Sequence, residues 1–324
     1  MRTRREFIQT AGAAAAAASA LTSMTAGAQA PGKMTIGIIG FQMSSETHAR
    51  VANAAEAAAK AKGWTAQVLN SRGELSVNTS QFDTLIQAKV GGIIVCMGKP
   101  VEADAQFKKA KDAGIPVITV MSGASPHAAF DIAVNEYSVG SRAAIYLMDQ
   151  LNYRGNILTQ RFEGNTATRI RGKVLDAVLS ENAAVKQLGT HTMARTATWR
   201  DDVRSGMSAL LLRNQGTVDG IWASFDGQAY VIDDLLQQAG GARGKPVLVS
   251  VDGGPETYRR IADPKSFLSA TVAIPFERMG TEAVNVMERL AVKKEAAASI
   301  NAGPYIYMAS ELVDKTNVAQ YLKK

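Results

Sequence analysis

The sequence predicts an α/β protein with parallel sheets, because short apolar runs alternate with amphipathic helical stretches along most of the chain. Runs such as 92–97 (GIIVCM) are continuously apolar, as strands buried on both faces of a parallel sheet require. The helical stretches between the runs have the length of crossovers in right-handed βαβ units. The alternation restarts after Asn135, which indicates two successive halves, each large enough for its own sheet.

The helices and strands of the first half are predicted from apolar runs and from the glycine and proline residues that lie between them. One helix is expected to stop at Gly63, and the segment 114–116 (GIP) opens the next strand. The expected strands are 35–39, 64–69, 92–97 and 117–120, and the expected helices are 46–62, 79–89 and 102–113. The second half is expected to hold helices at 137–151, 169–179, 200–213, 227–239 and 276–292, and strands at 155–159, 218–223, 246–251 and 268–274.

The first thirty residues predict a cleaved export signal. Two arginines in 3–9 (TRREFIQ) precede an alanine-rich apolar run at 11–20, and small residues alternate at 28–30 (AQA). The arginine pair followed by Phe-Ile resembles the twin-arginine signal. The run is too short to span about 30 Å of hydrocarbon. We therefore expect a twin-arginine type signal peptide at 1–30, cleavage near Ala30 and a periplasmic protein.

The composition is that of a soluble globular chain of 324 residues, with 46% hydrophobic and 20% charged residues. The net charge is +7, and removal of the signal leaves about +5, spread without a dense basic block. Binding to nucleic acid is therefore not expected. Cys96 is the only cysteine, so an internal disulfide and a lipid anchor are excluded, and its apolar run predicts a buried thiol. We expect a monomer.

The sequence carries no motif that indicates a catalytic or metal centre. It lacks a Gly-x-Ser-x-Gly elbow, a Gly-x-Gly-x-x-Gly fingerprint and a phosphate-cradling loop. Three widely spaced histidines and one cysteine do not form a metal-ligand pattern. An exported hydrolase that uses Asp252 with Glu46 or His48 is the enzyme alternative, but no nucleophile and base pair supports it. We expect no cofactor, no metal and no catalytic residues.

Several segments resemble, in order, the periplasmic sugar-binding proteins of the ribose-binding type, which serve ABC importers. The resemblance implies the type I periplasmic binding protein fold, with two doubly wound parallel-sheet lobes joined by three hinge crossings. A ligand would bind in the cleft between the lobes, and the lobes would close by a hinge motion. The segments are 113–119 (AGIPVIT), Asn135 with Gly140, 169–172 (RIRG), 220–223 (GIWA), 235–240 and 249–253 (VSVDG).

The resemblance also implies the boundaries of the two lobes. The crossings are expected near 134–135, 274–275 and 308–309. The N-terminal lobe would comprise residues 34–134 and 275–308, and the C-terminal lobe residues 135–274 and 309–324. Ligands in such sheets bind beyond the carboxyl ends of the strands.

The resemblance implies two polar anchors in the C-terminal lobe. Arg169 matches the family's binding arginine at the start of a helix, where its fork of donors suits paired hydroxyls or a carboxylate, with a surface helix arginine as the alternative. Asp252 follows the strand 247–251, where the family has an aspartate that binds hydroxyls. A turn-forming role before two glycines is the alternative for Asp252.

Two aromatic residues and a second aspartate complete this lobe's candidates. Trp199 falls where the family often has an aromatic that stacks on the sugar ring, with a core position as the alternative. Phe225 and Asp226 stand where family members offer an asparagine and an aspartate. Asp226 either binds ligand or caps the helix that begins at Gly227.

The N-terminal lobe departs from the family's pattern, which offers more polar groups at these positions. We expect three apolar residues either to line the cleft or to belong to the core: Phe41, Met97 and Met121. We expect His48 to form a hydrogen bond with the ligand. Asn135, at the first crossing, is also a candidate ligand residue. A cleft lined in this way suits a polyol, a deoxy or modified sugar, or a partly apolar ligand.

The sequence therefore predicts a binding protein that captures a sugar or sugar-like small molecule and delivers it to a membrane ABC permease. One alternative is a receptor that presents its ligand to a chemotaxis or two-component sensor. Another is a binder of a less polar, non-sugar ligand, and a more distant one is the exported enzyme.

Overall fold

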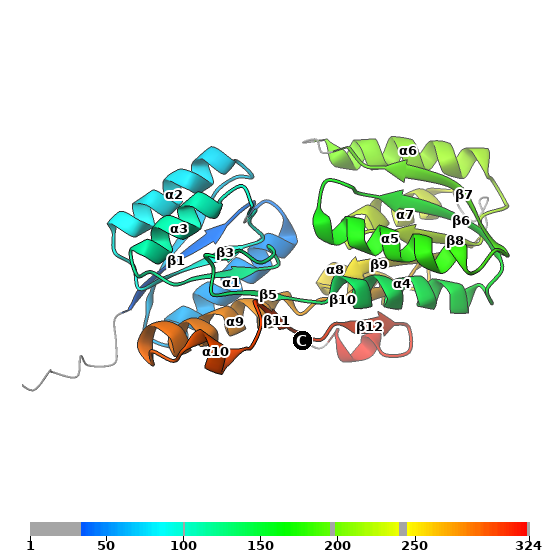
Figure 1. Cartoon of the computed structure of the whole chain (residues 1–324). Helices are drawn as coiled ribbons and strands as arrows, with labels where there is room; N and C mark the ends of the chain where they lie inside the picture. Colours follow the sequence, from blue (N-terminus) through cyan, green and yellow to red (C-terminus); the bar gives the residue numbers. More distant parts are fainter. Residues whose placement is uncertain (1–33, 100, 195–197, 240–244, 323–324) are drawn as a thin grey trace, which may run out of the picture. The chain divides into compact units, whose positions relative to one another are not determined.

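The strands of the described residues form two six-stranded sheets in the computed structural model of the chain (Figure 1). The structure describes residues 34–99, 101–194, 198–239 and 245–322. Residues 34–324 cluster as one compact unit. The predicted signal peptide and its cleavage site lie outside the described residues. Within the described ranges, no helix has the length and apolar character needed to cross a membrane.

The first sheet has the strand order β11-β5-β4-β3-β1-β2, and its paired strands are all parallel. We call this sheet with the helices that pack on it the first lobe. Its strands are β1 (Thr35–Gly40), β2 (Thr65–Asn70), β3 (Gly92–Cys96), β4 (Val117–Val120), β5 (Phe130–Ala133) and β11 (Tyr305–Tyr307). Its helices are α1 (Glu46–Ala61), α2 (Leu75–Gln87), α3 (Asp104–Asp112) and α9 (Phe276–Met287), followed by a π-helical turn (Glu288–Val292) and α10 (Ala297–Ile300).

The second sheet repeats this order as β12-β10-β9-β8-β6-β7, with only the β10–β12 pair antiparallel. We call this sheet with its helices the second lobe. Its strands are β6 (Gly155–Arg161), β7 (Val185–Thr192), β8 (Gly220–Ala223), β9 (Val247–Asp252), β10 (Leu268–Ala273) and β12 (Glu311–Asp314). Its helices are α4 (Glu136–Gln150), α5 (Thr166–Ser180), α6 (Trp199–Arg213), α7 (Asp226–Gln238) and α8 (Pro255–Ala262), with a 3-10 turn (Val318–Gln320).

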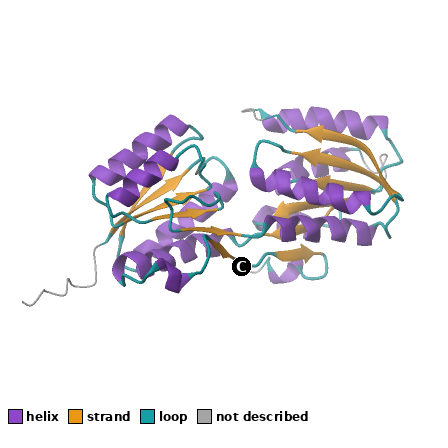
Figure 2. Ribbon diagram, viewed as in Figure 1, coloured by secondary structure: helices purple, strands orange, loops and turns teal. Residues whose placement is uncertain are grey.

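Helices cover both faces of each sheet, which explains the continuously apolar strands (Figure 2). In β3, Ile94 packs in the cluster that contains residues of α1 and α9, whereas its neighbour Ile93 packs with α2 and α3. In β9, Val249 packs in the cluster with α4 and α5, whereas Leu248 packs with α6 and α7. The predicted fold class, an α/β protein with two doubly wound parallel-sheet lobes, is confirmed.

The chain passes between the sheets at three places. Residues 134–135 join β5 to α4, which packs against β9 and β10. Residues 274–275 join β10 to α9, which packs against α1 and β4. The segment 308–310 joins β11 to β12, and the Met308 amide donates to the Ala133 carbonyl at 2.8 Å.

Several elements differ from the sequence prediction. Helix α5 begins at Thr166, three residues before its expected start, because Asn165 caps it by accepting from the Ala167 amide at 2.8 Å. Helix α2 begins at Leu75 rather than at residue 79. The structure adds elements for which no pattern was recognised in the sequence. These are β5, β7, α8, α10, β11 and β12.

Helices α1 and α9 pack so closely that Gly280 has no room for a side chain. A Cβ at Gly280 would lie 2.3 Å from the Val51 carbonyl oxygen and 3.0 Å from the Ala55 amide nitrogen. Both atoms belong to the backbone of α1, which cannot move aside without shifting the helix.

We therefore expect Gly280→Ala to lower the free energy of unfolding by about 1–3 kcal/mol, the usual cost of overpacking. Gly303→Ala is the matched control, because a Cβ there meets no atom within 4 Å. It should change stability by less than about 0.5 kcal/mol. Urea denaturation of both variants measures this difference, and equal stabilities would contradict the close packing of α1 on α9.

Candidate functional site

All ten predicted ligand residues lie at or just past the carboxyl end of a strand, or in the first turn of the next helix. Because parallel strands end at the same edge of a sheet, the residues of each lobe share one edge. In both sheets the strand order reverses beside the first strand, between β1 and β3 and between β6 and β8. Ligands of open α/β sheets bind at such a reversal.

Asp252 stands at a strained corner where β9 ends. Its φ is 133°, and Gly253 and Gly254 follow with φ of 73° and 146°. Strained backbone of this kind costs of order 1–3 kcal/mol and clusters at functional sites. The Asp252 carbonyl accepts from the Ile274 amide at 2.8 Å, and 15% of its side chain is exposed. The corner thus presents one carboxyl group at the sheet edge.

Asp226 is buried beneath this corner and is saturated with hydrogen bonds. Its Oδ2 accepts from the Gly253 amide at 2.7 Å and from the Thr257 hydroxyl at 2.6 Å. Its Oδ1 accepts from the hydroxyl groups of Ser250 and Thr271. Helix α7 begins at Asp226 itself, and the carboxylate turns into the sheet instead of capping the helix. With four donors in place, Asp226 holds the corner and has no acceptor position to spare.

The two arginines of α5 have different partners. Arg169 donates from Nη1 to the Glu163 carbonyl at 2.8 Å and from Nη2 to the Thr166 hydroxyl at 3.0 Å. Arg171, which sequence reasoning did not select, contacts Asp252 Oδ1 from Nη1 at 3.5 Å. The structure therefore joins Arg171, and not Arg169, to Asp252. Arg171 was visible only as part of the 169–172 motif, and nothing in the sequence named its partners.

Burial raises the pKa of Asp252 to about 8. The positive charge of Arg171 opposes this rise, whereas the negative charges of Asp226 and Glu136 add to it. At neutral pH the Asp252 carboxyl group therefore holds its proton in most molecules. A protonated carboxyl group can donate one hydrogen bond and accept others, as a ligand hydroxyl can.

Three aromatic rings in contact form a second feature of this edge, and we call Phe162, Trp199 and Phe225 the aromatic wall. The Trp199 and Phe225 ring centroids are 5.6 Å apart at an interplanar angle of 62°. The Phe162 and Phe225 centroids are 6.3 Å apart at 70°. All three side chains are partly exposed. Phe162 was missed because no family motif covered the residue after β6.

The first lobe presents sulfur and aromatic groups at the equivalent edge. Met97 and Met121 follow β3 and β4 with φ of 54° and 52°, in the left-handed region. Their amides still donate to the next strand, at 2.8 Å to the Val120 carbonyl and 2.9 Å to the Ile132 carbonyl. Both side chains are partly exposed, whereas Phe41 is only 4% exposed.

His48 and Asn135 have local roles in the structure. His48 Nδ1 accepts from the Gln42 amide at 3.3 Å, and burial lowers the pKa of the imidazole to about 4. His48 is therefore neutral at physiological pH and keeps a second ring nitrogen for another bond. The Asn135 side chain accepts from the Ser138 amide at 3.1 Å and caps α4.

A buried carboxylate also holds the first-lobe loops, and the sequence did not reveal it. Asp131 accepts from the Thr119 hydroxyl at 2.7 Å and from the amides of Ser122 and Gly123 at 3.1 Å each. Burial raises the pKa of Asp131. The Ser122 hydroxyl in turn accepts from the Gly98 amide at 2.8 Å. These bonds tie the loops that carry Met97 and Met121 to each other.

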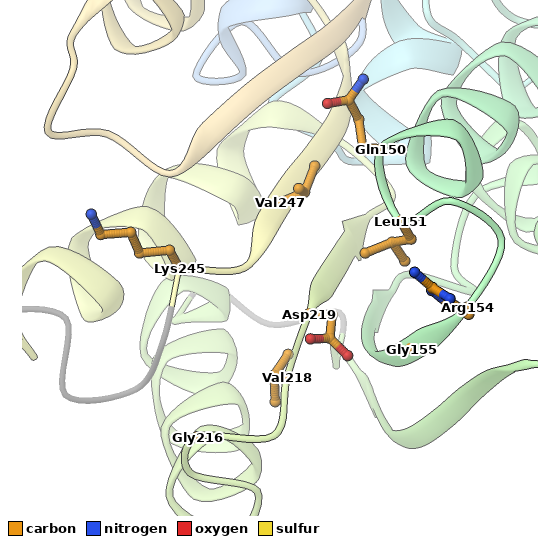
Figure 3. A pocket seen from close by; sticks show the side chains of 9 residues that line it. All are labelled: Gln150, Leu151, Arg154, Gly155, Gly216, Val218, Asp219, Lys245 and Val247. Carbon is orange, nitrogen blue, oxygen red and sulfur yellow. The ribbon is translucent and has the colours of Figure 1, made fainter.

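A hollow of about 610 Å³ lies at the opposite edge of the second sheet (Figure 3). Asp219 and Lys245 line it just before β8 and β9 begin, beside Arg154. None of the ten predicted residues lines this hollow. Over the described ranges, no group of three or more His, Cys, Asp and Glu residues is arranged to hold a metal ion.

Comparison with known proteins identifies the relatives of the chain. Residues 36–295 match the family described as the periplasmic binding protein domain. The chain is 30% identical over 190 residues to the xylitol-binding protein of Mycolicibacterium smegmatis, a match that covers 57% of this chain and 52% of that protein. It is 22% identical over 275 residues to the ribose import binding protein of Bacillus subtilis, covering 83% and 86%.

A solved structure gives the same result. The crystal structure of an ABC sugar transporter subunit from Rhodobacter sphaeroides superposes with a TM-score of 0.75 at 28% identity. The superposition covers 88% of this chain and 99% of that chain. The two-sheet architecture is thus shared over nearly the whole of the solved protein.

The raised pKa of Asp252 predicts a pH dependence of stability. Because the ordinary value is 3.8 and the folded value is about 8, the folded chain keeps a proton that the unfolded chain releases. The stability contributed by this proton is lost as pH rises from about 4 to about 8. We expect the melting temperature of the protein, measured relative to Asp252→Asn, to fall across this window. A difference that stays constant or grows with pH would contradict the assignment.

Proposed function

The chain belongs to the periplasmic binding protein domain family, and we propose that it captures an uncharged sugar or polyol for an ABC importer. The resemblance predicted from motifs such as 113–119 and 249–253 is thereby confirmed. The family consists of transporter binding proteins and not of enzymes, so the exported-hydrolase alternative has no support.

The observation that carries this proposal is the juxtaposition of a carboxyl group and an aromatic wall at one sheet edge. Asp252 ends β9, while Phe225 follows β8 and Phe162 follows β6. Polyhydroxylated ligands need a group that exchanges hydrogen bonds with hydroxyls and an apolar surface for their C–H face. This edge offers both within neighbouring parallel strands.

The pairing of the arginines supports an uncharged ligand. Arg171 faces two carboxyl groups, those of Glu136 and Asp252. Arg169 already donates to two oxygens of its own loop and helix. Arg50, the other arginine whose charge acts on Asp252, donates to the Gly253 carbonyl and to the Glu277 carboxylate. Because these guanidinium groups are occupied by protein oxygens, the edge favours hydroxyls over a carboxylate.

The first-lobe residues support a ligand with one less polar side. Met97 and Met121 follow the ends of β3 and β4, which are positions from which a polar side chain could contact a ligand. His48 is neutral and offers one nitrogen. A deoxy or modified sugar, or an acyclic polyol that can turn its carbon chain toward sulfur, fits this surface better than a fully hydroxylated ring. Of the relatives, the xylitol-binding protein is named for an acyclic polyol, which is one of these classes, whereas the ribose import binding protein is named for an unmodified pentose.

The family supports the partner and the location that we propose. We propose that the protein works in the periplasm, as a monomer that delivers its ligand to a membrane permease. The segment 1–30, with its paired arginines at 4 and 5, supports export by the twin-arginine route.

A thermal-shift screen of the purified protein tests the proposal. We expect xylitol, ribitol or ribose to raise the melting temperature, because a ligand at about 100 times its Kd adds roughly 2.7 kcal/mol to the folded state. Gluconate and benzoate should have no effect. A response to an acid alone, with none to any neutral polyol or sugar, would refute the proposed substrate class.

The compound with the largest effect is then titrated into Asp252→Ala. We expect a loss of about 1–3 kcal/mol in binding free energy, the scale for removing a buried hydrogen-bond partner. Asp112→Ala is the matched control, since this aspartate is 61% exposed at the end of α3 and pairs with Lys108. Unchanged affinity in Asp252→Ala with an intact fold would remove Asp252 from the site.

A further inference from the structure

Arg171 is a buried arginine whose guanidinium group connects three elements of the second-lobe edge. Arg171 as a whole is 3% exposed. Its Nε and Nη2 donate to the two carboxylate oxygens of Glu136, at 2.6 and 3.0 Å. Its Nη1 donates to the Ser224 carbonyl at 3.0 Å and contacts Asp252 Oδ1 at 3.5 Å. One side chain of α5 thus binds the start of α4, the end of β8 and the end of β9.

Arg171 interacts more strongly with Glu136 than with Asp252. Glu136 receives two short, parallel bonds, which is the strong bidentate geometry. Asp252 receives a single long contact through Oδ1. Among the described residues no hydrogen bond reaches Asp252 Oδ2, so this oxygen is left for another partner.

We propose that Arg171 is a positioning residue for Asp252. It holds one carboxyl oxygen in place, while Glu136 takes up most of the guanidinium charge, so that the second oxygen stays available to a ligand hydroxyl. The ligand part of this inference rests on the proposed function.

The backbone explains why Asp252 needs such a partner. Its φ of 133° belongs to a strained corner, and the corner's hydrogen bonds involve the Asp252 carbonyl, the Gly253 amide and the Gly253 carbonyl, which accepts from Arg50 Nη1 at 2.6 Å. These bonds fix the main chain but leave the direction of the side chain open. Arg171 supplies the one side-chain contact that sets it.

Glu136 weakens the contact between Arg171 and Asp252, because it takes up most of the guanidinium charge. Without Glu136, the full positive charge of Arg171 would face Asp252, hold it as a carboxylate and compete with a ligand. Without Arg171, the negative charge of Glu136 would face Asp252 with the charge of Arg50 left to oppose it. The charged and titratable groups that face Asp252 are Arg171 of α5, Glu136 of α4, Asp226 and Tyr230 of α7, and Arg50 of α1.

The test measures the titration of Asp252 directly and needs no ligand. Protein with ¹³C-labelled aspartate is titrated by NMR, and the Asp252 carboxyl signal is identified by its absence in Asp252→Asn. We expect Arg171→Met to move the titration midpoint upward and Glu136→Gln to move it downward, each by about one pH unit. Arg171→Lys, which keeps the charge, should return the midpoint toward that of the unmodified protein.

Opposite shifts in the two variants are the result that a purely structural arginine would not give. Arg161→Met is the matched control, because Arg161 pairs with Asp176 and should leave the Asp252 midpoint unchanged. An unmoved midpoint, or shifts in the same direction, would overturn the proposal. If Arg171→Met fails to fold, Glu136→Gln decides alone, since glutamine keeps the shape and one acceptor. If no compound in the thermal-shift screen raises the melting temperature, the proposed function is contradicted. The opposite shifts of the Asp252 titration midpoint would still support the positioning role of Arg171.

Discussion

A buried carboxylate, that of Asp226, accepts hydrogen bonds from β9, β10, α8 and the loop after β9, and the second-lobe site depends on these bonds. They compensate for the strained backbone at Asp252 by anchoring the next amide. They also keep Asp226 itself out of reach of a ligand. Arg171 then sets the direction of the Asp252 side chain. The partly exposed carboxyl group of Asp252 is therefore the outermost part of a buried polar network.

The first lobe also has a buried aspartate that holds the loop after a strand, but the residues at its surface differ. Asp131 is buried and accepts from the two amides that follow Met121, and Ser122 links this loop to the loop after Met97. In both lobes, an interior carboxylate holds a residue with positive φ at a strand end. The lobes differ in what that residue presents, which is a carboxyl group in the second lobe and thioether groups in the first. This difference is why we expect a ligand with two unlike sides.

The sequence predicted the two sheets because buried parallel strands need continuous apolar runs, which local composition reveals. It missed β7, an edge strand whose residues are mostly exposed and polar, and α8, which is only eight residues long. Asp252 could be found because it follows an apolar strand at a position where the resembled family has an aspartate. Arg171 could not, because its partners Glu136 and Asp252 lie 35 and 81 residues away and only the folded chain brings them together.

The most direct test of this account is a crystal structure of the protein with the neutral compound that stabilises it most. We predict that a pair of ligand hydroxyls lies within hydrogen-bond distance of the Asp252 carboxyl group and that the ligand's carbon chain contacts the aromatic wall. A ligand bound in the hollow beside Arg154 and Lys245, or one that does not touch Asp252, would contradict it.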